Sequence, residues 1–283
     1  MTTPQTQTTR AWPRSWLFVP GNRPERFGKA VLSGADAVIV DLEDAVPPVE
    51  KTTARAHVCH WLSLAPTHGG GPRPPVYVRI NAATTCEFAD DVKALSGLPG
   101  VTGLIVPKTE DAATLKRAAQ GAGDALRLVP LIETARAFAS LSEITAAPRV
   151  ERMMFGTIDF QLDIGIEGDG DELLFFRSQL TLASRLAGIG APVDGVSTVL
   201  DDAGFIEAAA RRARSLGFRG KLCIHPKQIG PVHAAFAWRE DEIEWAKRVI
   251  AAADASGGAA VALDGKMVDA PVIAKAREIL SSL

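Results

Sequence analysis

The feature that most constrains the fold is a series of eight short apolar runs, spread over residues 16–224 of this 283-residue chain. Most of the runs are continuous rather than alternating with polar residues, which is typical of parallel strands covered on both faces. Segments with helical spacing of their apolar residues separate the runs. The runs lie at residues 16–19, 37–40, 76–80, 103–106, 128–132, 153–155, 192–196 and 221–224. Eight strands with intervening helices predict an α/β fold, the closed TIM (β/α)₈ barrel.

An open, doubly wound parallel sheet is the alternative arrangement for such a series. The barrel is favoured because it typically needs about 250 residues, a length that this chain provides. In addition, no Gly-x-Gly-x-x-Gly sequence, which would mark a dinucleotide-binding sheet, follows the first run. With 47% hydrophobic residues, the chain can bury the large core that either fold requires.

Charge and composition narrow the class of partner. The formal net charge of −2 gives no reason to expect a nucleic acid or a membrane surface. The longest apolar stretches have the length of strands, well short of the roughly 18 residues of a membrane span. Residues 1–9 are rich in Thr and Gln and lack the apolar core of a secretion signal. Three scattered cysteines form no disulfide framework, and an odd count fits a reducing compartment, so we expect a cytoplasmic protein.

Three segments are predicted along the chain. Residues 1–13 are expected to be a disordered tail, residues 14–230 the catalytic barrel, and residues 231–283 a C-terminal extension. The extension contains a helical segment at residues 241–253, a hairpin whose turn is Asp264-Gly265, and a last helix from Pro271. It could pack against its own barrel or lie as a lid over the barrel of a neighbouring subunit.

Polar or ionisable residues follow every one of the eight runs. In a parallel barrel the carboxyl ends of the strands share one rim, which is where catalytic sites of this fold lie. After the Pro20-Gly21-Asn22 turn that ends the first run, the residues at these positions are Asp41, Glu43, Arg79, Lys108, Glu133, Asp159, Asp194 and His225. Each alone is explained as a helix cap or a surface charge, but the complete set predicts a site at this rim.

Two carboxylates in this set have the spacing of a metal site. Glu133 follows the run at residues 128–132, and Asp159 follows the next run. Because neighbouring strands deliver them to the same rim, they are expected to converge. Mg²⁺ favours a few carboxylate oxygens and leaves the rest of its shell to water and substrate. The alternative is that both residues cap helices; the surrounding polar residues favour the metal.

Arg79 is the candidate for holding the substrate, since its planar guanidinium pairs with a carboxylate through two hydrogen bonds. Asp41 and Glu43 would support either the metal's waters or this arginine. A metal beside an arginine suits a 2-oxo or 3-hydroxy acid, whose enolate the metal stabilises as a carbon–carbon bond breaks or forms.

A group of cations surrounds the first run. Arg14, Arg23 and Lys29 are all within this part of the chain. Solvated surface charge is one explanation for such a group, and a binding site for a phosphate tail is the other.

Eight segments carry a resemblance to a known family. They are residues 14–27, 40–46, 78–81, 106–108, 132–135, 156–159, 223–226 and 265–271. In this order they resemble the citrate lyase β-subunit-like branch of the HpcH/HpaI aldolase/citrate lyase family. The resemblance implies a TIM barrel with Mg²⁺ on Glu133 and Asp159, Mn²⁺ being the other metal that would serve. Arg79 and Glu133 would contact the substrate.

The resemblance also implies lyase or aldolase chemistry on a short hydroxyacyl-CoA such as citryl-CoA or malyl-CoA, with acetyl-CoA and a 2-oxo acid as the partners. Arg14, Arg23 and Lys29 would then lie near the phosphates of CoA. In the malyl-CoA lyase relatives a neighbouring subunit supplies the acid/base aspartate, which Asp269 matches here. A homo-oligomer, a trimer, is therefore expected.

One departure leaves the substrate open. Family members often carry Tyr-Thr where this chain has Ser197-Thr198, in a segment that shapes the pocket. An aldolase acting on free 2-oxo acids without CoA, a thioester hydrolase with the same metal, and a subunit of a citrate lyase-like complex acting on carrier-protein-bound acyl groups are the alternatives.

Overall fold

The computed structural model describes residues 12–64, 73–123, 125–256 and 260–282. Most of the predicted N-terminal tail, residues 1–11, therefore lies outside the described residues. Two compact units are present: Pro13–Phe236, and a second unit built from the C-terminal segment that begins at Ala237. None of the helices in the described ranges has the length and apolar character that a bilayer span requires.

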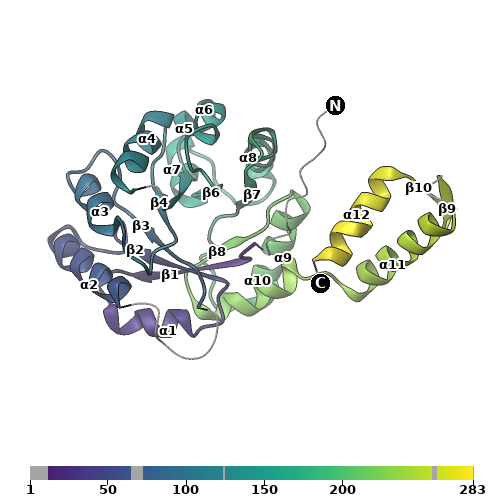
Figure 1. Ribbon diagram of the computed structural model, residues 1–283, viewed down its shortest axis with the longest axis horizontal. Helices are drawn as coiled ribbons and strands as arrows, with labels where there is room; N and C mark the ends of the chain where they lie inside the picture. Colours follow the sequence, from purple (N-terminus) through teal and green to yellow (C-terminus); the bar gives the residue numbers. More distant parts are fainter. Residues whose placement is uncertain (1–11, 65–72, 124, 257–259, 283) are drawn as a thin grey trace. The chain divides into compact units, whose positions relative to one another are not determined.

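Eight parallel strands form a barrel in the first unit (Figure 1). Their order in the sheet is β7-β6-β5-β4-β3-β2-β1-β8. The two ends of this order meet at a parallel bridge between Asp194 and Lys221, which closes the cylinder. The strands are β1 (Ser15–Pro20), β2 (Ala37–Asp41), β3 (Val76–Arg79), β4 (Gly103–Val106), β5 (Arg127–Ile132), β6 (Arg152–Phe155), β7 (Gly190–Val193) and β8 (Lys221–Cys223). The predicted TIM barrel is confirmed.

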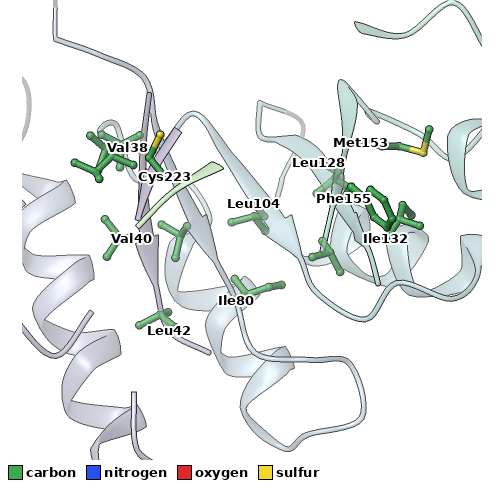
Figure 2. Close-up of a cluster of buried hydrophobic side chains, with 14 of the residues drawn as sticks. Val38, Val40, Leu42, Ile80, Leu104, Leu128, Ile132, Met153, Phe155 and Cys223 are labelled. Carbon is green, nitrogen blue, oxygen red and sulfur yellow. The ribbon is translucent and has the colours of Figure 1, made fainter. Parts of the chain in front are cut away.

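The strands are apolar on both faces because they separate two cores. Ile39 of β2 belongs to the core inside the cylinder, together with Trp16 and Tyr77. Val38 and Val40, on either side of Ile39, belong to the outer core between the strands and the helices. Figure 2 shows this outer core, which side chains of several strands supply. Since successive side chains point to opposite faces, a strand with two buried faces is apolar throughout.

Helices connect the strands. They are α1 (Phe27–Val31), α2 (Lys51–Ser63), α3 (Glu87–Leu95), α4 (Ala112–Gly121), α5 (Ala135–Ala139), α6 (Leu141–Thr145), α7 (Thr157–Ile164), α8 (Leu174–Ala187), α9 (Ala203–Ser215) and α10 (Ile229–Phe236). Asp111 and Asp202 cap α4 and α9 by accepting a backbone N–H three residues on. Helix α7 was not expected from the sequence. It begins two residues after β6, so Asp159 lies in its first turn rather than in a loop.

At the amino ends of the strands, a polar cluster joins α10 to β1. His233 Nε2 lies 2.8 Å from Ser15 Oγ and 3.3 Å from Asp36 Oδ1. Arg14 donates from Nε to Asp36 Oδ2 at 2.9 Å. One ring nitrogen serves both Ser15 and Asp36, unlike a catalytic triad, in which the two nitrogens contact the nucleophile and the carboxylate separately. The cluster therefore links β1 to the last helix of this unit.

The second unit has the predicted helices and hairpin. Helix α11 (Glu240–Ala255) and helix α12 (Ala270–Ser281) flank the antiparallel pair β9 (Val261–Leu263) and β10 (Lys266–Val268). Asp264 and Gly265 turn the hairpin with φ values of 51° and 71°, the left-handed backbone that a two-residue turn requires. Val249, Ile273 and Ala276 contribute to a core of its own.

Candidate active site

A cavity of about 440 Å³ lies at the carboxyl rim of the barrel, where the sequence predicts the site. Side chains at or just after the carboxyl ends of β2, β3, β5 and β6 supply its polar groups, and β1, β5, β6 and β8 supply most of its apolar wall. The lining residues are Phe18, Pro20, Asp41, Asp44, Ala45, Arg79, Leu131, Glu133, Phe155, Gly156, Thr157, Ile158, Asp159, Val196, Leu222 and Ile224. The cavity therefore combines acidic groups and one arginine with an apolar surface.

Glu133 and Asp159, the two predicted metal ligands, line this cavity together. Glu133 directly follows β5 and is 1% exposed. Burial, together with the nearby carboxylates of Glu43 and Asp159, raises the pKa of the Glu133 carboxyl to about 8. Negative charge at this point thus lacks a sufficient counter-charge from the protein.

This donor set fits a divalent cation. A cation placed between Glu133 and Asp159 would offset the repulsion that raises the Glu133 pKa. Across the described ranges, no group of three or more His, Cys, Asp or Glu side chains forms a complete metal cage. Two carboxylates with the remaining positions left to water and substrate match the preference of Mg²⁺.

Arg79 lines the same cavity, but its guanidinium is extensively paired. Nε and Nη2 donate to the two carboxylate oxygens of Asp41 at 2.7 and 2.6 Å. Nη1 lies 3.1 Å from Glu43 Oε2 and 3.3 Å from Asp44 Oδ2. Burial opposes the charge of Arg79, but the attraction of Asp41 outweighs it and the Arg79 pKa is raised. Asp41 thus occupies the edge of the guanidinium, Nε and Nη2, that the sequence analysis assigned to substrate, and Nη1 faces Glu43 and Asp44.

Comparison with known proteins identifies the family of this chain. The model of the family described as HpcH/HpaI aldolase/citrate lyase matches residues 14–226. The chain belongs to this family. A citrate lyase subunit beta-like protein of Deinococcus radiodurans is 37% identical over 276 residues, which cover 95% of this chain and 96% of that protein.

Two further proteins are similar to this chain over most of its length. A (3S)-malyl-CoA thioesterase of Cereibacter sphaeroides is 35% identical, over 95% of this chain and 93% of that protein. The crystal structure of CitE from Mycobacterium tuberculosis, in complex with magnesium, acetoacetate and coenzyme A, has a TM-score of 0.82 and 35% identity. It matches 96% of this chain and 98% of that chain.

The three predicted CoA-phosphate contacts do not lie together. Arg23 and Lys29 are exposed; Arg23 follows the carboxyl end of β1, where the cavity lies, and Lys29 lies further along the chain in α1. Arg14 precedes β1 and pairs with Asp36, so the whole strand separates it from Arg23. A six-residue strand spans roughly 20 Å. The sequence could not reveal this separation, since the cations are near one another only along the chain.

Lys108 is a site residue to which the sequence analysis gave no role. Its backbone N–H donates to Glu133 Oε1 at 2.5 Å, and its Nζ donates to Glu43 Oε1 at 2.8 Å. Two signals in the sequence pointed to it: its place just after the run at residues 103–106, and the match of residues 106–108 to a family segment. Like Lys108 and Glu43, Asp194 and His225 were placed at the rim but do not line the cavity. Asp194 binds Arg177 and Lys221 in the interior, and His225 caps a short helix.

Asp269, the predicted acid/base group, lies in the second unit. It precedes α12 and its Oδ1 accepts the N–H of Val272 at 3.4 Å, which makes it the N-cap of that helix. Its action in the cavity of a neighbouring subunit stays a prediction.

Gly156 leaves room for the Glu133 carboxylate. A Cβ atom at this position would lie 2.6 Å from Glu133 Oε2, which is closer than real contacts allow. Gly156→Ala is therefore expected to displace Glu133 and to weaken Mg²⁺ binding by about 10- to 100-fold, the usual effect of disturbing a residue that orients a ligand. Isothermal titration with Mg²⁺ measures this. Gly230→Ala, at a position where a Cβ meets nothing within 4 Å, is the control.

Proposed function

We propose that this chain is a Mg²⁺-dependent carbon–carbon lyase that cleaves a short hydroxyacyl-CoA, such as citryl-CoA or malyl-CoA, to acetyl-CoA and a 2-oxo acid, or forms it in reverse. The observation that carries the proposal is that Glu133 and Asp159 line one cavity together with Arg79, at the catalytic rim of the barrel. Membership of the HpcH/HpaI aldolase/citrate lyase family supports it.

The residues of the cavity have distinct tasks in this reaction. Glu133 and Asp159 would hold the metal, which when bound supplies electrostatic stabilisation of the negative charge that develops as the carbon–carbon bond breaks. Asp41 holds the Arg79 guanidinium still at the wall of the cavity, so that its positive charge would face the reacting fragment.

The first turn of α7 offers a further contact for the 2-oxo acid. Residues 157–159 border the cavity, and the N–H groups of a first helical turn have no partner within the helix. These groups favour an anion such as a carboxylate. Phe18 and Phe155 belong to the apolar part of the lining and would exclude water from the reacting carbon atoms.

Proton transfer would complete the cleavage. As the bond breaks, the hydroxyl group of the substrate passes its proton to a basic group of the site and becomes the carbonyl of the 2-oxo acid, while the acetyl-CoA fragment leaves as an enolate. This enolate takes up a proton at carbon to give the methyl group. We assign the exchange at this carbon to Asp269 of a neighbouring subunit, within a homotrimer.

CoA is the proposed carrier of the acyl group. Support comes from the CitE structure of Mycobacterium tuberculosis, which is a complex with magnesium, acetoacetate and coenzyme A. Arg23 and Lys29, both exposed and both after the carboxyl end of β1 in the chain, are the proposed contacts of the CoA phosphates. Arg14 is omitted because Asp36 already pairs with its guanidinium at the other end of the strand.

A thioester hydrolase is the second candidate, because one 35% identical relative is a (3S)-malyl-CoA thioesterase. The two reactions differ in their products. A lyase gives acetyl-CoA and a 2-oxo acid, whereas a hydrolase gives free CoA and a hydroxy acid.

A panel of acyl-CoA thioesters incubated with the purified chain tests the proposal. Acetyl-CoA and a 2-oxo acid are expected with Mg²⁺ and are expected to disappear with a chelator, because the developing charge then has no cation. Chromatography separates acetyl-CoA from free CoA. Free CoA as the sole product would support the hydrolase. Turnover only after addition of an acyl-carrier protein would place the chain in a larger complex, and turnover of free acids alone would remove CoA from the proposal.

A further inference from the structure

Lys108 connects the two buried glutamates of the site through different atoms. It follows β4, between the strand ends that carry Glu43 and Glu133. Its backbone N–H holds Oε1 of Glu133, and its ammonium group holds Oε1 of Glu43. The neighbours Pro107 and Thr109 are buried, and the Thr109 hydroxyl donates to the carbonyl of Val106 at 2.8 Å. The turn that presents Lys108 is therefore anchored on both sides.

The backbone of Lys108 adopts a conformation that lysine rarely takes. Its φ is 48°, in the left-handed region that favours glycine. With this φ the chain turns away from β4 while the N–H of Lys108 remains directed at Glu133. A glycine would adopt the same backbone without strain, so the side chain must contribute something that glycine lacks. That contribution is the contact between the ammonium group and Glu43, whose side chain is only 7% exposed.

The two oxygens of Glu133 have different surroundings. Oε1 accepts the N–H of Lys108. Oε2 is the atom that a Cβ on Gly156 would approach to 2.6 Å, and Gly156 lines the cavity next to Asp159. Because Lys108 occupies one oxygen, the other is the one that remains for a ligand in the cavity.

We propose that Lys108 is a positioning residue, which fixes the Glu133 carboxylate through its left-handed backbone N–H so that a single oxygen, Oε2, is presented to the cation. The ammonium group of Lys108 stabilises this backbone by binding Glu43. The inference rests on the proposed metal site and deepens it, since it assigns how the carboxylate is oriented for Mg²⁺ rather than what reaction follows.

Two substitutions separate the backbone from the charge. Lys108→Ala and Lys108→Gly both remove the ammonium group, so their electrostatic effect on a nearby cation is the same. Only glycine adopts the left-handed backbone without strain. The alanine variant is expected to bind Mg²⁺ about tenfold more weakly than the glycine variant, which corresponds to the usual cost of this conformation for a residue with a Cβ. Isothermal titration with MgCl₂ in the absence of substrate gives the dissociation constants.

Arg149 provides a matched control. It also has a left-handed backbone, with φ 62°, and its side chain binds the backbone carbonyls of Gly123 and Ala119. It does not line the cavity. Arg149→Ala and Arg149→Gly are expected to differ in melting temperature but to bind Mg²⁺ equally.

The outcomes distinguish this inference from the proposed function. Equal Mg²⁺ affinities of Lys108→Ala and Lys108→Gly, with or without a difference in melting temperature, overturn the positioning role and leave the lyase untouched. A parent protein that binds no Mg²⁺ refutes the metal site itself. If the two variants differ tenfold in Mg²⁺ affinity but the parent protein forms no lyase product, the role of Lys108 is supported and the reaction is refuted.

Discussion

Glu133→Gln is expected to abolish measurable Mg²⁺ binding and to lower turnover by about 10³-fold or more. The metal's stabilisation of developing charge is worth several kcal/mol, and each 1.36 kcal/mol is a factor of ten in rate. Gln keeps an oxygen that can accept the N–H of Lys108, so the local fold should persist. Mg²⁺ titration and initial rates on the acyl-CoA substrate measure the two losses.

The same substitution is expected to stabilise the metal-free protein at alkaline pH. The pKa of Glu133 is about 8 in the folded chain, against 4.5 for an unperturbed glutamate. Because the folded state binds this proton more tightly, ionisation of Glu133 destabilises the fold as pH rises from about 4.5 to 8. The neutral Gln escapes this cost. Without Mg²⁺, the melting temperature of the variant should therefore exceed that of the parent at pH 8 and equal it at pH 4.

A control and a contradictory result complete this test. Glu143→Gln changes an exposed glutamate of α6 and should alter neither Mg²⁺ binding nor turnover. If Glu133→Gln retained the Mg²⁺ affinity of the parent, Glu133 would not be a ligand and the proposed metal site would be wrong.

Asp269→Asn is expected to lower turnover by about 10²- to 10⁴-fold, the usual contribution of a general acid or base. Asn caps helices about as well as Asp, so α12 should keep its N-terminal hydrogen bond to the N–H of Val272. Mg²⁺ affinity and melting temperature should therefore match the parent. Asp111→Asn, which alters the equivalent cap of α4, is the control and should remain fully active.

Mixed oligomers test whether Asp269 acts in a neighbouring subunit. Glu133→Gln and Asp269→Asn chains are each expected to be nearly inactive. When both are produced together, some sites should combine an intact Glu133 from one chain with an intact Asp269 from the other, and activity should return in part. If Asp269 served its own chain, every site would lack one of the two groups and the mixture would stay inactive. Nearly full activity of Asp269→Asn alone would remove the residue from the mechanism.

The order of the strands and the location of the site could be predicted from the sequence. Strands with two buried faces need continuous apolar runs, and this requirement is visible along the chain around Val38–Val40 as it is around residues 128–132. Since parallel strands end at one rim, the residue that follows each run is placed there by the fold alone. Glu133, Asp159, Asp41 and Arg79 were found in this way, and all four line the cavity.

Some local features were not predicted because short-range sequence signals for loops, helices and strands compete. The segment after β6 contains Gly156 and Asp159, which indicate a loop, yet α7 begins at Thr157. The strand at residues 190–193 is less apolar than the other seven, and its predicted position was shifted toward residue 196. Asp194, directly after this strand, contributes its backbone to the bridge that closes the barrel and its carboxylate to Arg177 and Lys221. Its task is structural, which no local pattern distinguishes from a catalytic one.

The sequence by itself therefore determined the barrel and the set of groups at its rim, because burial and strand direction act through each segment separately. Only the tertiary structure decided which of these groups are paired. Arg79 meets Asp41 across 38 positions of the chain, and Lys108 meets Glu43 across 65. The closing of the barrel brings such groups within hydrogen-bonding distance, and their desolvation there sets the pKa of Glu133 and the orientation of Arg79. These contacts join residues that are far apart in the chain, so they cannot be read from the order of the residues.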